Sequence, residues 1–195
     1  MIRLKNFTEL DKQEIKLIFK WRNDTSIAQF MRTKKINIKE HLKFIKNLHK
    51  DSSKKYFLVF KDEQSIGVID FVNISENSCE FGLYAKPNLK GVGNILMNEI
   101  KKYAFENLKV KNLKAYVFKS NHRALSLYLK HHFYIYNEDE NIFYVELKQT
   151  TNLTSKKNEN NGGGGVSFLG FKIVILRQAI AQISSFIYPS SVVAI

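Results

Sequence analysis

Three segments typical of β-strands follow one another between residues 56 and 85, with no helical pattern between them. They are Tyr56–Lys61, Ile66–Ile74 and Cys79–Ala85, and each is rich in β-branched and aromatic residues. The two turns that separate them are too short for a crossover helix, so successive strands must run antiparallel. This pattern excludes an all-helical fold and a purely parallel sheet, and it places antiparallel strands at the centre of the chain.

Helical and strand patterns flank these three strands on both sides. Residues 8–11 and 37–40 each present an N-cap residue with an acid three positions later, which predicts helices ending near Trp21 and Lys50. Downstream we expect one helix beginning near Gly93 and another capped by Ser120 or Asn121. The remaining predicted strands are Met1–Phe7, Asn112–Phe118, Phe133–Tyr136 and Ile142–Leu147. The fold class is therefore mixed α/β (α+β), in a single domain.

The composition of the chain changes near residue 149. Residues 1–148 are predicted to form the domain, residues 149–165 a polar linker that ends in four glycines, and residues 166–195 an apolar tail. A run of G nucleotides encodes a glycine run and is prone to slippage, so our hypothesis is that the tail reflects a variable reading frame and has no function. The alternative is a membrane-surface anchor. A membrane span is disfavoured because Lys172, Arg177 and Pro189 divide the tail into runs shorter than ~20 apolar residues.

The charge balance indicates an anionic partner. Lysine and arginine total 31 against 18 acids, a net charge of +13 that lies mostly before residue 149. The lysines are spread through helices and turns without an aromatic platform, so we expect no nucleic-acid partner. The single cysteine, Cys79, excludes a disulfide framework, and the five histidines lack the spacing of metal ligands, so we expect no metal. The N-terminus does not read as a signal peptide, which leads us to expect a cytoplasmic protein without an integral membrane role, either a monomer or a homodimer.

Two motifs suggest chemistry. Gly91-Val92-Gly93 lies where a strand passes into a helix, so the main-chain N–H groups of Lys90–Asn94 can approach a ligand and form an anion-binding nest. The sequence around this glycine pair matches neither a P-loop nor a dinucleotide-binding fingerprint. Farther along, Asn121 and Tyr128 lie two helical turns apart and so share one face of a predicted helix.

Together these segments resemble the Gcn5-related N-acetyltransferase (GNAT) superfamily. The resemblance rests on the glycine pair and on a later motif, over residues 1–148, and the matching positions are Gly91, Gly93, Asn121, Ala124, Tyr128 and Phe133. Two positions depart from the family pattern. Asn88 replaces a glutamine or arginine, which puts one phosphate contact in doubt, and His132 replaces a glycine, which predicts a different turn.

The resemblance implies an acetyl-CoA-dependent enzyme with helices on both faces of a mostly antiparallel sheet and one splayed pair of strands. Pantetheine would lie along the main chain of Leu83, Tyr84 and Ala85, and the pyrophosphate on the loop residues Lys90, Gly91, Val92, Gly93 and Asn94. Asn121 would hydrogen-bond the cofactor, although a plain helix cap is the alternative. Tyr128 would protonate the departing thiolate, with a core tyrosine as its alternative.

The general base is open at this stage. His49 lies four residues after Ile45, so we expect it to point inward, and a histidine titrates in the range that deprotonating an ammonium requires. Glu80 is the family's frequent alternative, and water is a third. We place His41 off the inward face, while His122, His131 and His132 flank the predicted cofactor helix.

The acceptor is suggested by Trp21-Arg22-Asn23-Asp24, followed by Phe30. This start resembles a GNAT subgroup of flagellated bacteria that acetylates the 4-amino group of UDP-4-amino-4,6-dideoxy-N-acetyl-β-L-altrosamine in pseudaminic acid biosynthesis for flagellin glycosylation. The resemblance implies a small nucleotide-sugar substrate, and we expect it near Trp21, Arg22, Phe30 and Glu80. The alternatives are a GNAT enzyme acting on a protein N-terminus or a polyamine, and a non-catalytic acyl-CoA-binding module.

Overall fold

The computed structural model describes residues 1–149 and 193–194. Its elements follow in the order β1 (Ile2–Asn6), η1 (Phe7–Glu9), α1 (Lys12–Arg22), α2 (Thr25–Ala28), α3 (Ile38–Leu48), β2 (Lys55–Lys61), β3 (Gln64–Val72), β4 (Ser78–Ala85), α4 (Gly93–Lys102), η2 (Tyr103–Asn107), β5 (Asn112–Phe118), α5 (His122–Lys130), β6 (Tyr134–Glu138), β7 (Ile142–Lys148) and β8 (Val193–Ala194). This confirms the predicted succession of strands and helices through residue 148.

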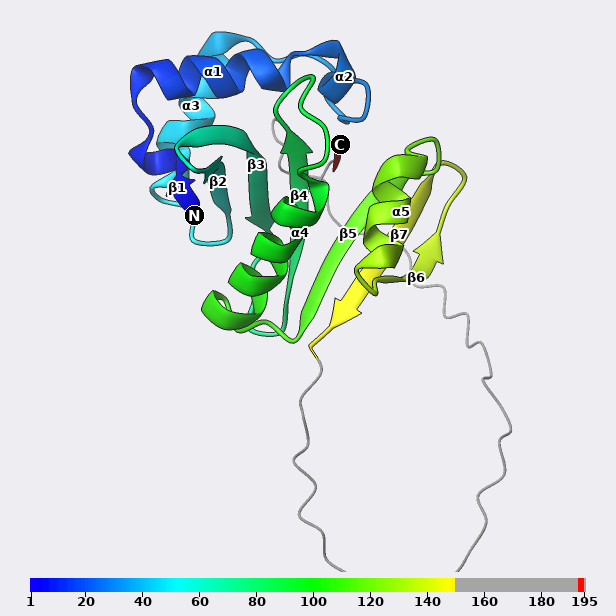
Figure 1. Ribbon diagram of the computed structural model, residues 1–195. Coiled ribbons are helices and arrows are strands. Elements are labelled where there is room, and N and C mark those ends of the chain that lie inside the picture. The colour runs from blue at the N-terminus through cyan, green and yellow to red at the C-terminus, as the bar shows by residue number, and fades with distance from the viewer. Residues whose placement is uncertain (150–192, 195) are drawn as a thin grey trace, which may run out of the picture. The chain divides into compact units, whose positions relative to one another are not determined.

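One sheet joins these strands in the order β1-β2-β3-β4-β5-β7-β6 (Figure 1). Strands β1 to β4 are antiparallel to their neighbours, as are β5, β7 and β6. The exception is the parallel pair β4–β5, which holds register only from Ser78 opposite Asn112 to Glu80 opposite Lys114. Beyond Glu80 the two strands diverge, so the expected splayed pair is confirmed.

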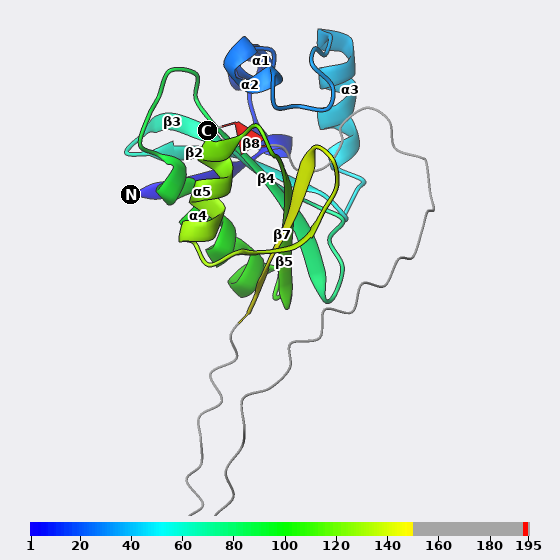
Figure 2. The ribbon, with the colours of Figure 1, turned by 90° about the vertical axis from the view of Figure 1, so that its right-hand side faces the viewer.

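The short strand β8 pairs with β4 beyond the point of divergence. Val193 lies opposite Leu83, and Ala194 lies opposite Tyr84, in parallel register (Figure 2). The rest of the predicted tail, and the predicted linker after Gln149, lie outside the described residues. Among the residues that are described, none of the helices is long and apolar enough to cross a membrane.

Helices cover both faces of the sheet, as expected. On one face α4 and α5 contribute Leu96, Met97, Ile100, Ala124 and Tyr128 to the larger hydrophobic cluster. On the other face α1, α2 and α3 contribute Ile18, Trp21, Ile27, Ile45 and Leu48 to the second cluster. Side chains alternate along each strand, so β3 supplies Ile69 and Phe71 to the first cluster but Val68 and Val72 to the second.

Several local predictions need correction. The first long helix is capped by Asp11 with Glu14 in a capping box, whereas the segment at Thr8 forms a 3-10 turn. The prediction placed the cap one turn too early, because Thr8 and Asp11 also present an N-cap residue with an acid three positions later. The box at Asn37 and Glu40 is confirmed. The helix α2 and the π-helix η2 were not predicted.

Candidate active site

The loop before α4 has the backbone of an anion-binding nest. Gly91 adopts a positive φ of 84°, and a Cβ placed there would meet no described atom within 4 Å, so the glycine serves backbone conformation rather than packing. Val92 is the N-cap of α4, and within the described residues no side chain caps the N–H groups of that first turn. These N–H groups, at the positive end of a ten-residue helix, are available to a phosphate.

The main chain of β4 beside this loop is free of β5 and pairs there with the short strand β8. Leu83, Tyr84 and Ala85 are buried, yet β5 has already diverged from them. The hydrogen-bonding edge of Leu83 and Tyr84 accepts an extended segment, because β8 pairs there. An extended pantetheine chain requires the same kind of edge.

Tyr128 approaches the divergent strands from α5. Its side chain is completely buried, and its ring packs against Phe81 and Phe133 with centroids 5.3 Å and 5.6 Å away. Among the described residues its hydroxyl finds no hydrogen-bond partner. Burial raises the pKa of Tyr128 well above 10, and the charge of Asp70 raises it further, so the phenol stays protonated at neutral pH.

A pocket of about 280 Å³ opens on the opposite face, where α1 to α3 lie. Its polar lining combines two cations, Arg32 and Lys114, with a single acid, Glu80. The Arg32 guanidinium lies 4.4 Å from the centre of the Tyr116 ring. The remaining lining residues are Asn73, Ala115, Tyr136 and Tyr144. This pocket suits an acceptor that carries negative charge and a stacking surface.

Comparison with known proteins agrees with this geometry. The family model of the acetyltransferase (GNAT) domain matches residues 2–134. The chain belongs to the GNAT family. It is 71% identical over 150 residues to acetyltransferase PseH from two Campylobacter jejuni strains, which covers 77% of this chain and 96% of each relative.

Solved structures of GNAT enzymes show the same fold. The crystal structure of Campylobacter jejuni N-acetyltransferase PseH in complex with acetyl coenzyme A aligns with a TM-score of 0.68 at 68% identity, covering 77% of this chain and all (100%) of that one. A Vibrio cholerae spermidine N-acetyltransferase in complex with CoA and spermine aligns with a TM-score of 0.65 over 76% of this chain and 95% of its own, at 20% identity. That second likeness concerns the fold alone. The GNAT domain match and the 71% identity to PseH together show that the chain is an N-acetyltransferase.

The turn after α5 contains His132, the residue that departs from the second GNAT motif. His132 adopts a φ of 71°, the left-handed conformation that the family's glycine favours. The backbone at His132 is therefore one that a glycine would also fit, and the expected difference in the turn stays a prediction. Asn88 also takes a positive φ, 66°, which asparagine tolerates better than most residues.

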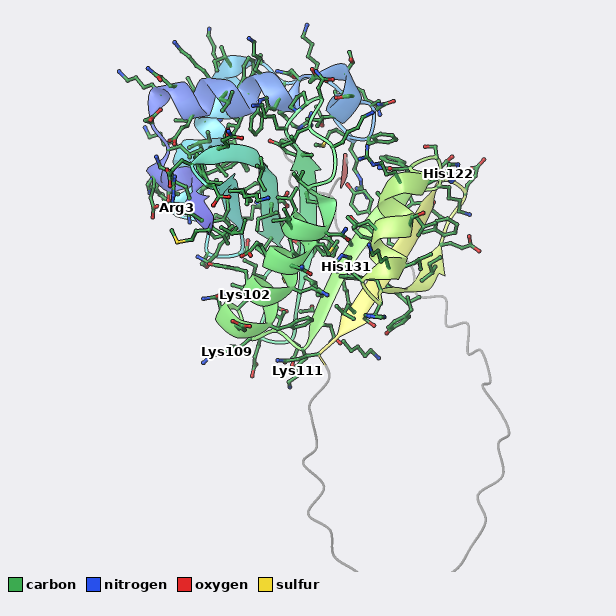
Figure 3. All side chains as sticks on the ribbon, viewed as in Figure 1. Arg3, Lys102, Lys109, Lys111, His122 and His131 are labelled. Carbon is green, nitrogen blue, oxygen red and sulfur yellow. The ribbon has the colours of Figure 1, made fainter. Side chains whose placement is uncertain are left out.

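Asn121 caps α5, as one of the two interpretations of the sequence predicted. Its side-chain Oδ1 accepts a hydrogen bond from the N–H of Ala124 at 3.2 Å. At the other end of α5, His131 lies 3.0 Å from Asn94 Oδ1 and so links α5 to the first turn of α4. Figure 3 shows His131 at the end of α5 beside α4 and His122 at the opposite end. Burial, with nearby lysines, lowers the pKa of His131.

The histidines of α3 are placed differently from expectation. His49 is the C-cap residue and is exposed, whereas His41 is buried, with 2% of its surface exposed. His49 keeps helical backbone angles (φ −59°, ψ −25°), but it is the C-cap residue after the last buried position, Leu48, so its exposure follows from its place at the end of α3. His49 lines a second pocket, of about 350 Å³, with Asp51, Lys54 and Tyr56. Glu80 does not belong to that pocket.

The residues expected near the acceptor also separate. Trp21 is buried in the second hydrophobic cluster, and Phe30 packs against the same cluster. Arg22 is buried and donates through Nη2 to the carbonyl oxygen of Thr33 at 2.7 Å, so it holds the loop that carries Arg32. Glu80 alone of the four lines the pocket beside the divergent strands.

Two residues of this region, Arg32 and Asp70, were not predicted from the sequence. Arg32 lies in an irregular stretch, and its cationic charge alone gave no signal. Asp70 is an acid in the middle of an apolar strand, Ile66–Ile74, and that contrast was the signal available. Among the described residues, no group of three or more histidine, cysteine, aspartate or glutamate side chains could hold a metal ion.

Proposed function

We propose that this GNAT enzyme transfers the acetyl group of acetyl-CoA to the 4-amino group of UDP-4-amino-4,6-dideoxy-N-acetyl-β-L-altrosamine, the step of pseudaminic acid biosynthesis that serves flagellin glycosylation. The identity of 71% to PseH over 96% of its length supports this acceptor. The PseH complex with acetyl coenzyme A supports the donor. The structural observation that carries the proposal is the main-chain edge of Leu83 and Tyr84, which β5 leaves and which pairs with an extended segment, next to the uncapped start of α4.

The donor would bind by main-chain contacts. The pyrophosphate would lie on the N–H groups of Lys90–Asn94, with Gly91 allowing the approach. Pantetheine would pair with Leu83–Ala85, and an N–H of Leu83 or Tyr84 would polarise the thioester carbonyl. One such donor to a developing oxyanion is worth roughly 10²–10³ in rate. Asn121 would add a cofactor contact in addition to its cap.

Tyr128 would act as the general acid. Its buried phenol is protonated at neutral pH, and its hydroxyl, which lacks a partner among the described residues, is available to a sulfur atom. The role of His49 as general base stays a prediction. His49 is exposed and lines one pocket, whereas Glu80 lines another beside the divergent strands.

The acceptor pocket favours a nucleotide sugar over a polyamine. Arg32 and Lys114 can pair with a diphosphate, and Tyr116, Tyr136 and Tyr144 offer aromatic surface. A polyamine carries several positive charges and would need several acids, whereas the described lining contains only Glu80. The cytoplasmic location and the division into a domain over 1–148, a linker and a tail stay predictions.

A thiol-release assay tests the proposal. Purified enzyme is given acetyl-CoA with the UDP-4-amino sugar, with spermidine, or with a peptide bearing a free N-terminus. We expect turnover with the amino sugar and, in Tyr128→Phe, a loss of ~10²–10⁴ in kcat with unchanged acetyl-CoA binding. Turnover with spermidine or peptide alone would refute the acceptor. An unchanged kcat in Tyr128→Phe would refute the acid role.

A further inference from the structure

Asp70 lies in a niche that a glycine creates. It belongs to β3, and its register partner on β4 is Gly82. A Cβ placed on Gly82 would lie 2.5 Å from Asp70 Oδ2 and 3.0 Å from Oδ1. No real side chain tolerates such contacts, so the carboxyl group occupies the space of the missing side chain and lies against the main chain of β4.

This niche lies at the point where the sheet opens. The last paired residue of β4 is Glu80, and the next residue on the same face is Gly82. The carboxyl of Asp70 therefore lies on β4 between the end of its pairing with β5 and the edge at Leu83, where β8 pairs. A thioester held by the N–H of Leu83 or Tyr84 would have its carbonyl carbon beside this niche.

The carboxyl group is buried without full compensation. Asp70 is only 7% exposed, and its Oδ1 has no hydrogen-bond partner among the described residues. An unpaired buried acid costs stability, and such groups persist mainly where function needs them. Burial, followed by the charge of Glu80, raises the pKa of Asp70 from 3.8 to about 7, which is where a general base works best at neutral pH.

The ionisable groups around Asp70 come from every neighbouring element. Glu80 of β4 raises the pKa of Asp70, and the charge of Asp70 in turn raises the pKa of both tyrosines that flank the opening, Tyr116 and Tyr128. Tyr56 is its register partner on β2, and Arg32 lies over Tyr116. Asp70 thus shares one electrostatic environment with the proposed general acid.

We propose that Asp70 is the group that receives the proton of the acceptor ammonium. The inference rests on the proposed transfer of acetyl to an amine. The ammonium gives its first proton to the Asp70 carboxylate, and the neutral nitrogen attacks the thioester carbon. The C–S bond breaks as Tyr128 gives its phenolic proton to sulfur, and the phenolate recovers the second proton from the nitrogen. Asp70 later releases its proton to water, so amide, thiol and one proton are the products.

The test compares Asp70→Asn with the wild type across pH. The amide has nearly the shape of the carboxyl group, so we expect a folded protein that binds acetyl-CoA normally. For any amine that the wild type acetylates, we expect kcat/KM to fall ~10²–10⁴ near pH 7. In wild type kcat/KM should level off above about pH 7, whereas in the variant it should keep rising toward the pKa of the amine itself. Formate should partly restore Asp70→Ala, whose cavity would admit it.

Matched variants assign the base. Glu80→Gln removes a charge that raises the pKa of Asp70, so kcat/KM should still level off, but at a lower pH. His49→Asn should keep the wild-type shape of the pH profile. If either takes on the rising profile instead of Asp70→Asn, the proposal is wrong. An equal loss at every pH, or no formate rescue, would show a structural role only. If the wild-type enzyme acetylates no amine, the proposed function is refuted and this role with it. If the wild type is active and Asp70→Asn has the same kcat/KM and pH profile, this role alone is refuted.

Discussion

Replacing Asp70 by asparagine should stabilise the protein, and the gain should depend on pH. Burial raises the pKa of this acid from 3.8 to about 7 in the folded state, while the unfolded chain keeps the ordinary value. Between about pH 4 and pH 7 the folded state therefore binds more protons than the unfolded state, so stability falls as pH rises through this window. Asparagine cannot ionise and escapes this loss.

The magnitude follows from the size of the shift. A rise of about three pKa units corresponds to about 4 kcal/mol at pH values above 7, which is an upper figure because the protein relaxes around a buried charge. For a chain of this length we expect a difference in Tm of roughly 10 °C at pH 8. At pH 4 the protonated acid resembles the amide, so the difference should be small.

Thermal unfolding of the full chain, followed by circular dichroism between pH 4 and pH 8, measures this difference. Asp139→Asn is the control, because N–H groups of Asn141 and Ile142 bind the Asp139 carboxylate and lower its pKa. Asp139 stays ionised across the range, so its variant should show a constant offset in Tm above about pH 5. If the Tm offset of Asp70→Asn were equally constant with pH, the pKa of Asp70 would not be raised in the folded state and the reasoning would be refuted.

Three further changes test the loop, the helix end and the tail. Gly91→Ala should weaken acetyl-CoA binding about tenfold in a calorimetric titration, because alanine resists the φ of 84° that shapes the nest although it meets no described atom; unchanged affinity would contradict the nest. His132→Gly should raise stability by about 1 kcal/mol in urea unfolding with kcat unchanged, because glycine relieves the φ of 71°, and a loss of stability would contradict this reading. Truncation after Gln149 should preserve turnover and leave acetyl-CoA binding at least as tight, because β8 is the only described part of the tail and shares the β4 edge with the proposed pantetheine site. A truncated enzyme without turnover would instead give the tail a function.

The sequence determined the order of elements and the motif positions from which the donor site is proposed, because both depend on local chemistry. Alternating β-branched residues, capping boxes and a glycine pair act over a few positions, so they can be read along the chain. The motif positions Gly91, Asn121 and Tyr128 all lie at the elements that were predicted for them. The errors were local too: the cap fell at Asp11 rather than Thr8, and His49 is exposed because it lies at the end of α3, after the last buried position.

The tertiary structure decided which side chains share a site. Arg22 and Trp21 have the residue types of a binding surface, but packing of α1 against the sheet buries both. Arg32 lines the proposed acceptor pocket from a loop whose next residue, Thr33, is held by Arg22. Asp70 and Gly82 are twelve positions apart, and only the β3–β4 register places the carboxyl group on the glycine. Register and burial depend on partners distant in sequence, and they set both the free energy of a buried charge and the position of the proton that the reaction must move.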